Sequence, residues 1–189
     1  MLAEFKRDVF ANFVGMPLHR FDQQLGGKSY PAVQFATRTN PVFTDWHSRF
    51  YRDGRKTVPE DIARELSPMT VTVWFMDDGA ADHAGATLQT HSFTVGEVAL
   101  LVGALEERFD LAVNLRKNRG RWIIYVKSAS MSRLREVLLP HLLPEFAYKL
   151  GSEPRRDHTL APDSQVREMT WSDLIGNGER SPETVTRRG

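Results

Sequence analysis

Two adjacent carboxylates and a glycine, Asp77-Asp78-Gly79, end a run of large apolar side chains that begins at Val71. A carboxylate at the C-terminus of a helix opposes the helix dipole, so this placement requires a compensating cation. Hard divalent ions such as Mg²⁺ are bound by one or two carboxylates together with phosphate oxygens and water, and such an ion can activate water for attack on phosphorus. The alternative is an ordinary surface turn, in which Asp-Gly is common.

The residues ahead of these carboxylates decide whether a helix or a strand delivers them. Ser67 and Pro68 are typical of a helix N-cap and a first-turn proline. The β-branched alternation of residues 70–75 instead favours a strand that ends in an Asp-Gly turn. We give the start signal more weight and predict a helix. On a helix, Asp77 and Asp78 lie about 100° apart, so only one of them points into a given site.

A basic stretch is the second feature that could support chemistry. Residues 111–135 contain seven Lys and Arg residues and no Asp or Glu, which makes them a candidate for phosphate binding. Alternation into and out of a turn around Asn118-Arg119-Gly120 predicts a β-hairpin. Its outward face carries five polar residues, Asn114, Arg116, Arg121, Tyr125 and Lys127. Arginine can read guanine and asparagine can read adenine in a major groove, but a solvated strand face has the same composition.

An earlier hairpin repeats this mixture of side chains. Phe21 alternates with polar residues up to Gly26-Gly27, and the alternation resumes at Val33. A three-residue loop would pair Phe21 with Val33 and keep the apolar residues on one face, whereas a two-residue loop would split them. We predict the three-residue loop. The polar face would then carry Arg20, Gln24, Tyr30, Gln34 and Arg38. This second Arg, Gln and Tyr face favours DNA binding over a solvated surface.

The order helix, hairpin, helix occurs twice in the chain. Apolar residues at helical spacing predict helices over residues 2–13 and 41–50, on either side of the first hairpin. A capping box of Thr94 and Glu97 opens the helix before the second hairpin, and Ser130 caps the helix after it. The chain therefore contains an internal structural repeat. Only the second copy is preceded by the apolar motif.

Composition limits the class of protein. The 189 residues have a formal net charge of +1 and include no cysteine, so disulfides and thiolate chemistry are excluded. No apolar run approaches the roughly 20 residues of a membrane span, and the first residues lack the pattern of a signal peptide. Residues 151–189 are poor in aliphatic side chains, and we expect a flexible tail there. We expect an intracellular protein, cytoplasmic or organellar, that is neither secreted nor bound to a membrane.

Several of these motifs occur together in one known family. The matching stretches are residues 35–54, Trp74 to Gly79, Leu88-Gln89-Thr90-His91-Ser92-Phe93-Thr94, Ile124-Tyr125-Val126 with Ser130-Met131, and Tyr148-Lys149-Leu150. In them the chain resembles the LAGLIDADG homing endonucleases, in the subgroup whose second motif reads Trp-Phe-Met-Asp-Asp-Gly. The resemblance covers nearly all of residues 1–150.

The resemblance implies an α+β fold. Its expected form is a pseudo-twofold pair of αββαββα units, whose saddle-shaped antiparallel sheet lies in the major groove of DNA. The first repeat would be residues 1–66 and the second 67–150, followed by the tail over residues 151–189. The first motif of the family is missing from this chain. We therefore expect the first unit to be N-terminally incomplete and the motif helix to lack its twin.

The resemblance also implies roles for individual residues. Asp78 is the acid that holds Mg²⁺ or another divalent cation at the scissile phosphates, and Lys127 is the basic residue near the active site. His91 stands where the family usually has a glutamine beside the metal or its water. The residues assigned to DNA binding are Arg20, Gln24, Tyr30, Gln34, Arg38, Gln89, Asn114, Arg116, Arg119, Arg121 and Tyr125.

The function that this resemblance implies is site-specific cleavage of double-stranded DNA. The chain would then have a start codon assigned too far downstream, or it would have degenerated. Two alternatives stay open. One is a cleavage-inactive protein that binds DNA or intron RNA, as related maturases and regulators do. The other is an inert remnant. Its exposed motif helix would then associate with another chain, such as one that supplies the missing helix.

Overall fold

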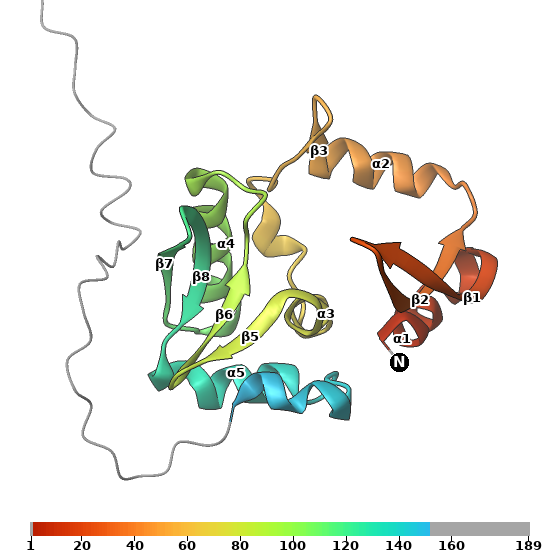
Figure 1. Ribbon diagram of the computed structural model, residues 1–189. Coiled ribbons are helices and arrows are strands. Elements are labelled where there is room, and N and C mark those ends of the chain that lie inside the picture. The colour runs from red at the N-terminus through yellow and green to blue at the C-terminus, as the bar shows by residue number, and fades with distance from the viewer. Residues whose placement is uncertain (1, 152–189) are drawn as a thin grey trace, which may run out of the picture. The chain divides into compact units, whose positions relative to one another are not determined.

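The computed structural model describes residues 2–151, and the chain divides into two compact units, Met1–Arg55 and Lys56–Gly189 (Figure 1). Both units combine helices with antiparallel strands, which confirms the predicted α+β class. Residues 57–66 belong to the second unit because Val58, Ile62 and Leu66 are buried in its core. The repeat boundary after residue 66 stays a prediction. The predicted tail lies outside the described residues, except for Gly151.

Unit 1 is a long hairpin flanked by helices. Its elements are α1 (Leu2–Val9), the 3-10 turn η1 (Ala11–Phe13), β1 (Val14–Leu25), β2 (Lys28–Thr37), α2 (Pro41–Phe50), β3 (Tyr51–Arg52) and β4 (Arg55–Lys56). The ring of Phe13 meets that of Phe43 edge-on, with 5.3 Å between their centroids. Phe10 contacts Phe35 at 6.5 Å. No residue among 2–55 is fully buried, so this unit has little core of its own.

The predicted loop of the first hairpin is wrong. Gly26 and Gly27 alone form the turn, both with positive φ, and Leu25 pairs with Lys28. Two glycines satisfy both left-handed positions of a type I′ turn, which matches the twist of the flanking strands. Phe21 therefore pairs with Ala32 rather than with Val33. The apolar residues are split between the two faces of the hairpin.

The same register divides the predicted DNA-binding face of unit 1. Arg20 and Gln24 share a face with Val33, whereas Tyr30 and Gln34 lie on the opposite face. Arg38 follows β2, and its Nη2 atom donates to the carbonyl of Asn12 at 3.4 Å. The five residues thus do not form one surface. Their individual roles in DNA binding stay predictions.

Unit 2 has the order helix, hairpin, helix, hairpin, helix. Its elements are the 3-10 turn η2 (Ile62–Arg64), α3 (Pro68–Asp78), β5 (Gly79–Asp82), β6 (Gly85–Gln89), α4 (Val95–Phe109), β7 (Val113–Asn118), β8 (Arg121–Val126), η3 (Ser128–Ser130), α5 (Met131–Leu138) and η4 (Pro144–Leu150). The strands form one antiparallel sheet in the order β5-β6-β8-β7. The helix, hairpin, helix order of α4 to α5 repeats that of α1 to α2, as predicted.

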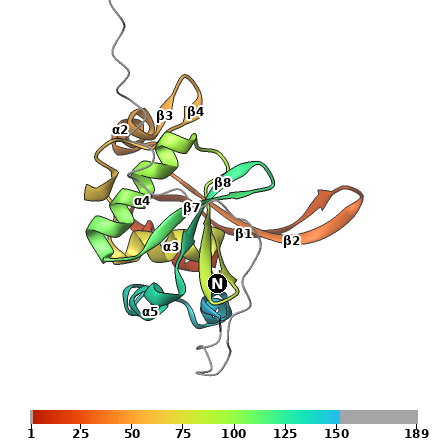
Figure 2. The ribbon, with the colours of Figure 1, turned by 90° about the vertical axis from the view of Figure 1, so that its left-hand side faces the viewer.

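One face of this sheet is covered by α4 (Figures 1 and 2). On that face Leu88, Leu115 and Ile124 occupy neighbouring strands, and each is at most 1% exposed. Val98 and Leu105 of α4, which contacts β7 and β8, are also fully buried. Because successive side chains of a strand alternate, the intervening residues form the opposite face of the sheet.

The motif segment is a helix, as its start signal predicts. The Oγ of Ser67 accepts from the backbone N–H of Thr70 at 3.2 Å, and the Oγ1 of Thr70 accepts from the N–H of Ser67 at 2.7 Å. This reciprocal cap satisfies two N–H groups that the helix itself cannot. Val71 and Phe75 are completely buried. Capping and burial together outweigh the strand propensity of the β-branched residues.

The caps of the following helices match the prediction in one case only. At α4 the N–H of Thr94 donates to Glu97 Oε2 at 2.7 Å, and the N–H of Glu97 donates to Thr94 Oγ1 at 3.3 Å. Ser130 does not cap α5. Its Oγ instead accepts from the N–H of Ala112 at 2.8 Å, which ties the start of β7 to η3. None of the helices described is both long and apolar enough to span a bilayer.

Candidate nucleic-acid interface and carboxylate site

The sheet face opposite α4 is polar, and we call it the polar face. In the register of β7 and β8, Asn114 pairs with Tyr125, and Arg116 and Arg121 have the same orientation. The predicted common face of these four residues is therefore confirmed. Neighbouring strands extend the polar face with Thr87, Gln89 and Asp82.

Arg116 crosses the polar face. Its Nη1 atom donates to Oδ2 of Asp82 at 2.6 Å. Its guanidinium carbon lies 3.9 Å from the centroid of the Tyr125 ring. The side chains of Arg116 and Asp82 are 27% and 26% exposed, respectively. The pair is thus held on the surface without being freely solvated.

Two amide groups on the polar face have unused hydrogen-bonding capacity. The Nδ2 of Asn114 and the Oε1 of Gln89 are buried, and neither has a partner among the described residues. Asn114 as a whole is 4% exposed. An unpartnered buried amide is costly, so these groups are expected to meet water or a ligand. Asn and Gln are also the side chains that can fork onto adenine.

The tip of the second hairpin is basic and exposed. Arg119 occupies the turn with a φ of 49°. Arg121 donates through Nη1 to the carbonyl of His91 at 3.2 Å, so the hairpin holds the loop that carries this histidine. The preceding Thr90 is buried, and its Oγ1 donates to the carbonyl of Trp122 at 2.7 Å. The exposed His91 therefore sits on an anchored loop.

The carboxylates of the motif lie at the margin of the polar face. Asp77 and Asp78 are exposed at the end of α3, and Gly79 directly begins β5. Gly79 pairs with Leu88, so the adjacent Gln89 lies at the end of the sheet where the helix ends. The polar face and the motif carboxylates thus occur side by side.

Lys149 is the cation at this helix terminus, and sequence reasoning missed its role. Its Nζ atom donates to the carbonyl of Met76 at 2.6 Å and to that of Asp77 at 3.2 Å. Carbonyls in the last turn of a helix have no partner within the helix, and a cation there also favours the dipole. The Tyr148-Lys149-Leu150 stretch can be recognised in the sequence as a family motif. Its contact with α3 cannot be predicted from local spacing, because Lys149 and Met76 are 73 positions apart.

Replacing Lys149 by Met is expected to lower the free energy of unfolding by about 1.5–3 kcal/mol, because two charge-assisted hydrogen bonds are lost. Urea unfolding followed by circular dichroism measures this change. Lys117→Met is the matched control, since Lys117 is exposed and its Nζ lies 5.3 Å from the centroid of the Trp122 ring. An equal loss in the two variants would contradict the capping role of Lys149.

Lys127 directly follows β8, at the end of the sheet away from the motif carboxylates. Gly79 aligns through Leu88 with Ile124, whereas Val126, the residue before Lys127, pairs with Ala86. Lys127 lies instead near Glu106: burial raises the pKa of Glu106, and the Lys127 charge partly offsets this. The predicted role of Lys127 near the active site stays a prediction.

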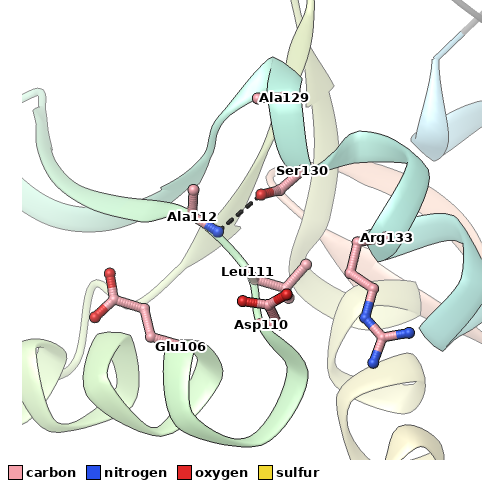
Figure 3. Close-up of a pocket in the computed structure, with 7 residues that line it drawn as sticks. All are labelled: Glu106, Asp110, Leu111, Ala112, Ala129, Ser130 and Arg133. Carbon is pink, nitrogen blue, oxygen red and sulfur yellow. Dashed lines mark hydrogen bonds between the residues drawn. The ribbon is translucent and has the colours of Figure 1, made fainter.

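A surface pocket of about 520 Å³ occurs beside α4 (Figure 3). Its lining residues are Glu106, Asp110, Leu111, Ala112, Ala129, Ser130 and Arg133. Of its charged groups, Arg133 is engaged, since it donates to the carbonyl of Phe109 at 3.0 Å and to Glu136 at 3.0 Å. The pocket adjoins α4, which covers the sheet face opposite the polar one.

The residues at the helix end fit half of a divalent metal site. Two exposed carboxylates at one point suit Mg²⁺, which is typically held by one or two carboxylates with the remaining positions filled by phosphate and water. Within residues 2–151, no cluster of three or more His, Asp or Glu side chains is arranged to hold a metal. The DNA phosphate and a second acidic group would have to complete the coordination.

Known proteins resemble this chain in sequence and in fold. Residues 1–134 match the LAGLIDADG DNA endonuclease family. The chain is 33% identical over 128 residues to the cytochrome b mRNA maturase bI2 of Debaryomyces hansenii, covering 67% of this chain and 49% of that protein. It is 32% identical over 127 residues to the intron-encoded endonuclease ai4 of Dictyostelium discoideum, covering 66% and 80%, respectively.

A solved structure supports the fold independently. The homing endonuclease I-WcaI, bound to its DNA recognition sequence, superposes with a TM-score of 0.73. The superposition covers 78% of this chain and 69% of that chain at 24% identity. The chain spans about half the length of the maturase. From the family match over most of its length, this chain belongs to the LAGLIDADG DNA endonuclease family.

Proposed function

We propose that the protein is a site-specific endonuclease that hydrolyses phosphodiesters of double-stranded DNA with Mg²⁺ or another divalent cation. The observation that carries this proposal is the position of the Asp78 carboxylate at the margin of the polar face. A surface that can read bases and a group that can hold a metal are adjacent there. Membership of the family and the likeness to an intron-encoded endonuclease support it.

Individual residues have separable roles in this proposal. A divalent ion, when bound, would neutralise charge on the scissile phosphate and lower the pKa of a water. Asp78 would supply its protein ligand, and Lys149 would fix the last turn that carries Asp78 through the carbonyls of Met76 and Asp77. His91, held on the loop that Arg121 anchors, would hydrogen-bond the attacking water.

The direct test is a cleavage assay on a pool of duplexes with a random central segment. The protein is expected to retain a small set of sequences and to cut them only when Mg²⁺ is added. The retained sequences should share a site. Retention without any sequence preference, or cleavage that persists in excess chelator, would refute the proposal.

The metal site would be completed by a second acidic helix. The described residues contain one helix that ends in Asp-Asp-Gly, and a chain or copy that carries a second such helix would supply the other acid. Adding such a chain should raise cleavage without changing the site that is cut. Sedimentation of the mixture measures the association.

Arg119→Asn is expected to weaken binding to all duplexes by a similar factor and to reduce the slope of log K against log salt by about 0.9, because one phosphate contact is lost. Asparagine tolerates the positive φ of this turn position. Arg108→Asn, in the last turn of α4, removes the same charge away from the polar face. A slope that changes equally in both variants would contradict a phosphate contact at Arg119.

A second candidate function is nucleic-acid binding without cleavage. One acid-bearing helix end is half of a two-acid site, and the maturase relative favours this alternative. Intron RNA is one possible partner, although the deep and narrow major groove of A-form RNA excludes reading by a sheet. Tight retention of structured RNA in preference to DNA, with no cleavage in Mg²⁺, would identify this function.

A further inference from the structure

Arg116 and Asp82 are joined across the whole width of the unit 2 sheet. Arg116 is on the outer strand β7 and Asp82 ends the opposite outer strand β5, with β6 and β8 between them. The register also sets them four residues apart along the strands. Arg116 aligns through Ile123 with Gln89 of β6, whereas Asp82 pairs with Gly85 of the same strand. On a flat sheet these offsets are about 14 Å and about 13 Å. The 2.6 Å ion pair therefore requires the sheet to curve, with the polar face concave along this diagonal.

The path between the two residues is built from Tyr125 and Gly85. A Cβ on Gly85 would lie 2.5 Å from the Oη of Tyr125, so the tyrosine lies over bare backbone. The guanidinium of Arg116 in turn lies over the tyrosine ring at 3.9 Å. Gly85 leaves space for the Tyr125 ring, and that ring packs against the guanidinium of Arg116. Asp82 then accepts a hydrogen bond from the guanidinium. Four residues, one from each strand of the sheet, thus set one orientation of the Arg116 side chain.

We propose that Asp82 is a specificity-determining residue, which positions Arg116 to bind guanine in the major groove. This inference rests on the proposed function. Nη1 is occupied by Asp82, while Nε and Nη2 make no hydrogen bond within residues 2–151. Guanine presents two acceptors, O6 and N7, to the fork of an arginine. The ion pair with Asp82 therefore leaves the Nε and Nη2 donors of Arg116 available to bind guanine.

The ion pair favours a base over a phosphate as the target of Arg116. A phosphate contact draws its strength from an uncompensated cation, and the Asp82 carboxylate neutralises this one. A base edge is neutral, so its recognition depends on hydrogen-bond geometry rather than on net charge. Holding the guanidinium in place also reduces the entropy lost when it binds. The neutralised charge and the fixed orientation of the Arg116 guanidinium both favour contact with a base edge over contact with a phosphate.

The experiment selects binding sites from a random duplex pool with the wild type, Arg116→Ala, Asp82→Asn and the double variant. The wild type is expected to prefer guanine at one position by about 10-fold to 100-fold. Both single variants should lose most of that preference at the same position and keep the preferences elsewhere. The double variant should behave like Arg116→Ala. Asp110→Asn is the control, because it makes the same charge change at the end of α4, at a φ of 54° that asparagine tolerates.

Each other outcome overturns the inference in an identifiable way. If Arg116→Ala weakens all sequences evenly, the arginine binds phosphate. If Asp82→Asn alters a different position from Arg116→Ala, the aspartate reads a base itself. If the wild type selects no site at all, the proposed function fails with it. If Arg116→Ala loses the guanine preference but Asp82→Asn keeps it, the endonuclease proposal stands and the positioning role of Asp82 does not.

A measurement on the DNA-free protein separates positioning from general stability. Rotation of the Arg116 guanidinium, observed through its Nε–Hε resonance in ¹⁵N spectra, is expected to be slow in the wild type and fast in Asp82→Asn. Asp82→Glu should restore part of the restriction, because it keeps the charge. Equally fast rotation in the wild type and in Asp82→Asn would refute the positioning role.

Discussion

Asp78→Asn is expected to abolish Mg²⁺-dependent cleavage of duplex DNA while leaving binding of the target within about twofold. The amide removes the charge that holds the metal, and a metal at the reacting phosphate contributes several kcal/mol to the transition state, roughly 1,000-fold or more in rate. Binding persists because the polar face and the basic hairpin tip are unaffected. Cleavage of a labelled target by the catalytically complete assembly measures the rate, and retention of the same target measures the affinity.

Asp77→Asn is the matched control for this experiment. The two carboxylates are neighbours at the end of α3 and are both exposed, but they project about 100° apart. Asp77→Asn is therefore expected to have a much smaller effect on the rate. Unchanged cleavage by Asp78→Asn, or an equal loss in the two variants, would remove Asp78 from the catalytic role.

Gly79→Ala is expected to lower the free energy of unfolding by about 3 kcal/mol, the upper part of the range for overpacking. A Cβ at this position would lie 2.4 Å from Cδ2 and 2.6 Å from the carbonyl oxygen of Phe75. Phe75 is completely buried, and the carbonyl belongs to the helix backbone, so neither atom can move away at low cost. The glycine is needed for close approach, since its backbone is extended, with a φ of −85°.

Gly103→Ala provides the control for this prediction. Gly103 lies inside α4, and a Cβ there meets no atom within 4 Å. Alanine in a helix interior is expected to stabilise the protein by up to about 1 kcal/mol. Urea unfolding should thus give changes of opposite sign for the two substitutions. A neutral Gly79→Ala would show that the end of α3 relaxes more readily than its packing implies.

Local signals predicted the elements of unit 2 well. Ser67 and Thr94 initiate helices through bonds to residues only three positions away, so their patterns are visible in the sequence. The second hairpin was predictable for a related reason, because the paired Leu115 and Ile124 are buried against α4 and fix the register. The four polar residues that share its outer face followed from that register.

The first hairpin was harder to predict because nothing buried fixes its register. Phe21 is 37% and Val33 is 38% exposed, so neither placement of the apolar residues gains a core. The turn chemistry of the two adjacent glycines then decides. We gave apolar pairing more weight than turn chemistry, and the predicted face of unit 1 failed for that reason.

The site residues that the sequence did not reveal are those with distant partners. Lys149 reaches back 73 positions to Met76, and Arg116 reaches back 34 positions to Asp82. Neither contact has a periodic or capping signature. Lys127 was assigned by its place in a motif, and the register moves it to the other end of the sheet. Residue type and spacing identified the polar face of unit 2 and the motif carboxylates but not the pairing of Lys149 with Met76 or of Arg116 with Asp82.

The exposed hairpin of unit 1 has a consequence for how the protein can change. Substitutions at exposed positions usually shift stability by less than about 0.5 kcal/mol. No residue of β1 or β2 is buried, so this hairpin can accept new side chains at little cost in folding. The polar face of unit 2 is more restricted, because Asn114, Ile123 and Thr87 are buried within it. Mutational freedom is therefore unequal between the two hairpins, and the first can diverge in sequence with little loss of stability.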